Sequence, residues 1–238
     1  MKRITLALLI LAGSVSGSIS MTPALAQQNA VTKPSASLDR PEEPNLVFDD
    51  DGGKTQIVPA DLSVAAEKKF HGGEVMKSAQ QVSIFLGSGW GDAQVRPRQV
   101  ALGDLSSRQA AGLEELKKNN VRTLSAAPKV EDFSDLKNTR FNDLTIQRKL
   151  SDLLASKAIP APGPSTIYVV YLAPGISSTL GSNKAGLDYA AYHNYVHLDA
   201  GEVRYVVVPF HEKEDRHTAA AARAFADTAL NPNGNGWY

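Results

Sequence analysis

The sequence predicts an α/β fold: a single three-layer domain with a mostly parallel central sheet. Three segments have the composition of buried strands, at 81–86 (QVSIFL), 166–172 (TIYVVYL) and 204–210 (RYVVVPF). The last two are almost continuous apolar runs, which is typical of strands covered on both faces. Segments with helical patterns are interleaved with the strands, and such alternation favours parallel strands with helices packed on both faces of the sheet.

Three segments are expected to form helices: 106–120, 145–157 and 218–230. The second has the clearest amphipathic pattern, because its apolar residues recur at the i, i+4, i+7, i+8 spacing of one helix face. These residues are Ile146, Leu150, Leu153 and Leu154. The third helix is rich in alanine, and the turn-forming sequence NPNGNGWY follows it.

Residues 1–26 have the features of a cleavable secretory signal. Lys2 and Arg3 precede the apolar run 4–11, and a small-x-small motif ends at Ala26. The apolar run is too short for a membrane anchor, and no second run of about 18–20 apolar residues follows it. We therefore expect a secreted or periplasmic protein with no membrane span after cleavage.

The remainder divides into two parts by composition. Residues 27–61 are rich in Pro, Ser, Asp and Gly and are expected to form a flexible linker, and residues 62–238 are expected to form the folded domain. The chain has no cysteine, which excludes disulfides, thiol catalysis and thiolate metal sites. Its net charge is zero, so electrostatics give no reason to expect nucleic acid or an anionic membrane as a partner.

The stretch 189–211 holds three of the five histidines. His193 and His197 have the i, i+4 spacing at which two imidazoles on a helix face reach one zinc ion, and His211 is the most plausible third ligand. Zinc proteases place a glutamate directly after the first histidine, whereas Asn194 stands here. We therefore expect no cofactor, and zinc only under an alternative interpretation. The charged run 212–216 after His211 is expected to be a solvated connection.

Four landmarks in the folded part occur in the order found in a known family. They are FHGG at 70–73, the strand 82–86 followed by Gly87 and Trp90, the strand 167–172 with AYH at 191–193 after it, and TALNPNGNGWY at 228–238. Together they resemble the EXORDIUM, or phosphate-induced protein, family. Its members are secreted proteins best known from plant cell walls, and the family has bacterial relatives.

The resemblance implies an exported role linked to growth or cell-surface signalling, with unsettled biochemistry. Some bacterial relatives carry a His-Glu-x-x-Glu motif that would suit a metallopeptidase-like site. The matching positions here are Arg223, Ala224 and Asp227. Arginine does not bind zinc and alanine cannot act as a base, so we expect a non-catalytic binding protein. The alternative is a hydrolase with a divergent or degenerate zinc site.

The expected ligand site lies in turns at the ends of strands and helices, where α/β folds bind ligands. The residues assigned to it are His71, Gly72, Gly73, Tyr192, His193, Asn231, Asn233 and Trp237. A carbohydrate, a small molecule or a protein at the cell surface is the expected partner.

Overall fold

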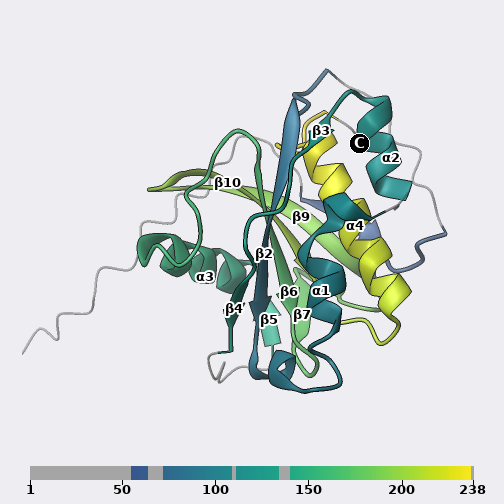
Figure 1. Ribbon diagram of the computed structural model, residues 1–238, viewed down its shortest axis with the longest axis vertical. Coiled ribbons are helices and arrows are strands. Elements are labelled where there is room, and N and C mark those ends of the chain that lie inside the picture. The colour runs from purple at the N-terminus through teal and green to yellow at the C-terminus, as the bar shows by residue number, and fades with distance from the viewer. Residues whose placement is uncertain (1–54, 64–71, 109–110, 134–139, 237–238) are drawn as a thin grey trace, which may run out of the picture. The chain divides into compact units, whose positions relative to one another are not determined.

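A mixed β-sheet organises the residues that the computed structural model describes, which are 55–63, 72–108, 111–133 and 140–236 (Figure 1). All of them fall within the unit Pro41–Tyr238. The expected signal segment 1–26 and linker residues 27–54 lie outside the described residues, as do His71 and Trp237.

The main sheet has the strand order β1-β9-β10-β6-β2-β3, and β4 pairs with β2 near its end. The strands are β1 (Gln56–Pro59), β2 (Ser78–Leu86), β3 (Arg122–Thr123), β4 (Val130–Asp132), β6 (Thr166–Leu172), β9 (Tyr189–Leu198) and β10 (Gly201–Val208). The pairings of β2 with β3, β4 and β6 are parallel, as is that of β6 with β10. Strand β9 pairs antiparallel with both β10 and β1.

The expectation of helices mixed with strands holds, but a mostly parallel sheet is not confirmed. The middle of the sheet is parallel and one side of it is antiparallel. The difference arises from β9, which the sequence analysis did not recognise as a strand. It forms a hairpin with β10 through a short turn that ends at Gly201, whose φ is 114° and therefore favours glycine.

Helices pack on both faces of the sheet (Figure 1). Helices α1 (Arg98–Gly103), α2 (Ala111–Lys118) and α4 (Glu214–Leu230) lie on one face, and α3 (Asp143–Ala155) lies on the other. Short 3₁₀ turns cover Ser88–Gly91 and Leu105–Ser107, so the first expected helix is divided between a 3₁₀ turn and α2. Helix α3 begins at Asp143, two residues before its expected start, and the side chain of its N-cap Asn142 accepts from the Thr145 amide.

Two hydrophobic cores lie on the two faces. On the face of α4, the core includes Phe85, Trp90 and Phe225. On the face of α3, it includes Tyr168 and Leu150. All seven residues of β6 are buried, which agrees with the two-sided strand predicted from its apolar run.

Strand β1 corrects the expected boundary between linker and domain. The side chain of Val58 is fully buried, and Val58 pairs with Ala191 of β9. Arg216 of α4 donates to the Ala60 carbonyl oxygen at 2.6 Å. Residues 55–61 therefore belong to the folded domain and not to a linker. The sequence QIVP is short and ends in proline, so it gives no recognisable strand pattern.

The segment 177–186 also contains strands. A small second sheet consists of β5 (Arg140–Asn142), β7 (Ser177–Leu180) and β8 (Asn183–Lys184). Pairing of β5 with β7 positions the chain for the first turn of α3, which begins directly after β5.

Candidate functional site

Strand β9 places two of the expected site residues on opposite faces of the sheet, because side chains alternate along a strand. Tyr192 belongs to the core on the face of α3. His193 is 1% exposed and pairs with Val206, which belongs to the core on the face of α4. His193 lies within a strand, so its assignment to a turn is wrong. The two residues cannot line one rim.

Gly73 lies beside the turn that follows α4, whereas nothing lies within 4 Å of the Cβ position of Gly72. A Cβ atom added to Gly73 would lie 2.3 Å from the Gly236 Cα, so the two backbones touch. The Gly236 amide donates to the Oδ1 atom of the buried Asn231 at 2.7 Å. The structure thus brings Gly73 and Asn231 together through Gly236, and the half-buried Asn233 lies in the same turn. This contact is a close crossing of two backbones with no room between them for a ligand.

The histidine spacing that favoured a zinc site lies on a strand and not on a helix. Four residues of a strand span about 13 Å, whereas zinc–nitrogen bonds are about 2.1 Å long, so His193 and His197 cannot share one ion. The Nε2 atom of His211 lies 2.8 Å from the Ala190 carbonyl oxygen. Within the described ranges, no three His, Asp or Glu side chains are grouped so that they could hold a metal ion.

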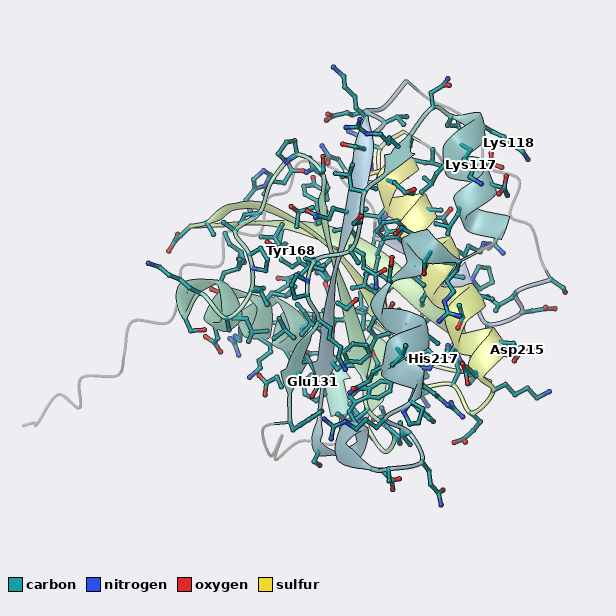
Figure 2. The ribbon with its side chains drawn as sticks, in the orientation of Figure 1. Lys117, Lys118, Glu131, Tyr168, Asp215 and His217 are labelled. Atoms are coloured by element: carbon teal, nitrogen blue, oxygen red, sulfur yellow. The ribbon has the colours of Figure 1, made fainter. Side chains whose placement is uncertain are left out.

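The charged run after β10 is solvated as expected, although its last three residues already belong to α4. Residues 212–215 are exposed, but His211 is 6% exposed and His217, in the first turns of α4, is fully buried. Figure 2 shows His217 inside the molecule and Asp215 at its surface. The His217 ring lies 5.5 Å from the Phe210 ring and 5.4 Å from the His211 ring between centroids.

Burial disfavours a positive charge on this histidine pair. Burial is the main cause that lowers the pKa of His217 to about 3, and the nearby His211 and Arg98 contribute to the same shift. Burial also lowers the pKa of His211. Neither ring nitrogen of His217 has a hydrogen-bond partner among the described residues. The pair lies beyond the carboxyl end of β10, where α/β folds bind ligands, but aromatic side chains fill the space around it. It is a closed cluster and not an open site.

Asp143, at the start of α3, is the centre of a second polar cluster. Its carboxylate accepts from the Tyr192 hydroxyl at 2.9 Å, the Tyr205 hydroxyl at 2.9 and 3.0 Å, the Asn194 amide at 3.1 Å and the Gln147 amide at 3.0 Å. Burial, with the charge of Asp143 second, raises the pKa of Tyr192 and of Tyr205 well above the usual range.

Both carboxylate oxygens of Asp143 are occupied by side chains of β9, β10 and α3 itself. The cluster therefore anchors the first turn of α3 to the sheet, and the helix dipole adds to the stabilisation of the negative charge. No local pattern marks Asp143 in the sequence, because three of its donors come from strands that lie at least 49 residues further along the chain.

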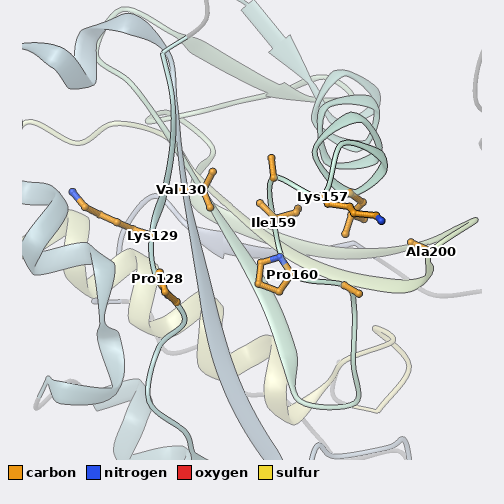
Figure 3. Close-up of a pocket in the computed structure, with 10 residues that line it drawn as sticks. Pro128, Lys129, Val130, Lys157, Ile159, Pro160 and Ala200 are labelled. Carbon is orange, nitrogen blue, oxygen red and sulfur yellow. The ribbon is translucent and has the colours of Figure 1, made fainter.

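An open groove of about 600 Å³ lies on the face of α3, near the amino ends of β6 and β10 (Figure 3). Three segments form it: 128–130 leading into β4, the chain at and after the end of α3, and the turn between β9 and β10. The lining residues are Pro128, Lys129, Val130, Leu154, Lys157, Ala158, Ile159, Pro160, Ala161 and Ala200. Apart from the two lysines, every lining residue is apolar.

The wall after α3 is held in place by local hydrogen bonds. The Ala158 amide donates to the Leu153 carbonyl oxygen at 2.9 Å and closes the helix end. Pro160 follows and accepts from the Tyr168 hydroxyl at 2.7 Å. Ile159 between them is 4% exposed. The ring of Pro160 fixes its own φ angle, so this wall has few alternative conformations. The groove is therefore already formed before any ligand arrives.

The wider comparisons give no relatives for this chain: no family model, no curated protein and no solved structure matches it. The resemblance to the EXORDIUM family therefore stays a prediction.

Proposed function

We propose that this chain is an exported, non-catalytic binding protein that holds a small apolar ligand in the groove between Val130, Ile159 and Ala200. The observation that carries the proposal is the apolar lining of an open, preformed groove of about 600 Å³. Ligand sites of small molecules are typically concave, largely apolar and about 300–1,000 Å³ in volume.

The lining favours an apolar small molecule over a carbohydrate. Sugar recognition depends on polar side chains that hydrogen-bond hydroxyl groups, and commonly on an aromatic ring on which the sugar packs. Among the lining residues there is no aromatic ring, and the lysines are the only polar side chains. Burying sugar hydroxyls against such walls would cost free energy, because their bonds to water would not be replaced.

The polar clusters elsewhere support a binding role more than a catalytic one. A catalytic acid, base or nucleophile must reach the substrate. The Asp143 carboxylate is taken up by side-chain donors, and His217 is enclosed by aromatic rings. The rival proposal, a hydrolase with a divergent zinc site, would need the ligand histidines of β9 to meet, and the strand holds them apart.

Export is part of the proposal and rests on the signal-like sequence at 1–26. The EXORDIUM-like landmarks, which imply a cell-surface role, point the same way. No helix within the described residues is long and apolar enough to cross a membrane.

Binding can be tested with N-phenyl-1-naphthylamine, a neutral apolar dye whose fluorescence rises in apolar surroundings. We expect saturable binding to the purified chain. Ala158→Trp, which places an indole in the groove, should abolish it. Ala155→Trp is the matched control, because Ala155 is an exposed residue three positions earlier that does not line the groove. Equal binding by the two variants, or no saturable binding by the unaltered chain, would overturn the proposal.

A further inference from the structure

The charges around the groove point to the chemistry of its ligand. Lys129 and Lys157 are the only charged residues in the lining, and in the view of Figure 3 they stand on opposite sides of Val130 and Ile159. The two lysines differ in what their ammonium groups contact.

The ammonium of Lys129 is occupied. Its Nζ atom lies 2.6 Å from the Glu131 Oε1 atom and 3.0 Å from the Gln99 Oε1 atom. These contacts direct it toward α1 on the other face of the sheet and away from the groove (Figure 3). Only its apolar stem is available to a ligand, as is common for lysine beside apolar surfaces.

Lys157 is different, since its exposed ammonium forms no hydrogen bond or ion pair with any described residue. Its backbone adds a second observation, because its φ is 57°, in the left-handed region. Helices commonly end with a left-handed residue, but glycine or asparagine usually occupies the position. A residue with a longer side chain costs roughly 1–2 kcal/mol there. Lys157 therefore makes the end of α3 less stable than glycine would, and its side chain lies at the mouth of the groove.

We infer that the ligand is an anionic amphiphile, with an apolar body on the groove walls and a carboxylate or phosphate group paired with Lys157. This inference rests on the proposed function. Asp199, which precedes Ala200 in the opposite turn, is exposed and would repel an anion. The head group would thus lie toward Lys157. The effect is modest, because an exposed ion pair contributes roughly 0.2–1 kcal/mol.

The experiment compares three probes with the same twelve-carbon chain and different head groups: dodecanoate, dodecanol and dodecyltrimethylammonium. Each is titrated against bound N-phenyl-1-naphthylamine, at concentrations below the micelle-forming range of the two ionic probes and below the solubility limit of dodecanol. We expect dodecanoate to bind about 1.4- to fivefold more tightly than dodecanol, because that range corresponds to one exposed ion pair. The cationic probe should bind most weakly. High salt should remove the preference by screening.

Lys157→Gln should remove the preference for dodecanoate and leave dodecanol binding unchanged. Lys213→Gln is the control, since Lys213 is an exposed lysine directly before α4 and does not line the groove. Melting curves show whether Lys157 serves only the end of α3, in which case Lys157→Gln lowers the melting temperature without changing head-group preference. Equal binding of all three probes, or a preference that survives Lys157→Gln, overturns this inference alone. Failure of every probe to bind overturns the proposed function as well.

Discussion

The imidazole of His217 stacks on the indole of Trp90, with ring centroids 6.1 Å apart and ring planes 24° from parallel. Tyr171 and Phe210 complete the enclosure. The charged and titratable groups that act on His217 are His211 and Arg98, and both disfavour a positive charge there. Arg98 is itself fixed in this region, because its guanidinium donates to the His211 carbonyl oxygen at 2.7 Å.

Acid should destabilise the fold through this cluster. The pKa of His217 is about 3 in the folded chain and near 6.5 when unfolded, so below pH 6.5 the unfolded chain binds a proton that the folded chain does not. The stabilisation is complete above pH 6.5 and is lost as the pH falls toward 3. This proton lowers the free energy of unfolding by about 1.4 kcal/mol for each pH unit between the two pKa values. Urea denaturation at several pH values measures the slope.

His217→Phe separates this effect from the protonation of carboxylates. It keeps a ring in the aromatic enclosure and removes two buried ring nitrogens that lack partners, so stability at pH 7 should stay the same or rise. Between pH 7 and 5 the variant should lose stability less steeply than the unaltered chain. Equal slopes in the His217→Phe variant and the unaltered chain would contradict the assignment.

Asp143→Ala should destabilise the fold by about 2–4 kcal/mol. The change leaves the buried hydroxyls of Tyr192 and Tyr205 without their acceptor, and an unsatisfied buried donor costs about 1–3 kcal/mol. Tyr192→Phe removes one hydrogen bond and should cost only about 1 kcal/mol. Urea denaturation of both variants checks this order. A loss for Asp143→Ala no larger than that for Tyr192→Phe would show that the cluster does not anchor α3.

The sequence could predict the elements whose pattern is local. Strand β6 has the bounds expected from its apolar run, and α3 follows from the stripe that includes Ile146 and Leu150. Strand β9 was not predicted because its two faces pack against two different cores. It therefore lacks the alternation of apolar and polar residues that marks a half-exposed strand. The partners of β1 and Asp143 lie far along the chain, so no local signal marks them.

The groove illustrates the same limit for function. Its walls come from three segments, near Pro128, Ile159 and Ala200, that only the fold brings together. Nothing in any one segment distinguishes it from an ordinary connection with proline and alanine. The expected site at Gly73 and Asn231 was placed in turns at the ends of strands and helices, and the structure fills that place with a backbone contact.

Gly73→Ala should be strongly destabilising, although it adds a single methyl group. The new Cβ atom would lie 2.3 Å from the Gly236 Cα and 2.6 Å from its nitrogen, so backbone must move. Overpacking of this kind typically costs about 1–3 kcal/mol. Gly103→Ala is the control, because nothing lies within 4 Å of its Cβ position at the end of α1. It should be neutral or slightly stabilising. Similar melting temperatures for the two variants would show that the crossing at Gly236 is not tightly packed.

Val58→Asp tests whether the segment before residue 62 is a linker or part of the fold. If 55–61 were a linker, a charge at position 58 would be solvated and the melting temperature would not change. Val58 is fully buried between β9 and the core on the face of α4, so an unpaired carboxylate there should cost several kcal/mol. Thr55→Asp, at a half-buried position just before β1, should change stability far less. Differential scanning calorimetry of the two variants tests this expectation. An unchanged melting temperature for Val58→Asp would show that residues 55–61 are part of the linker.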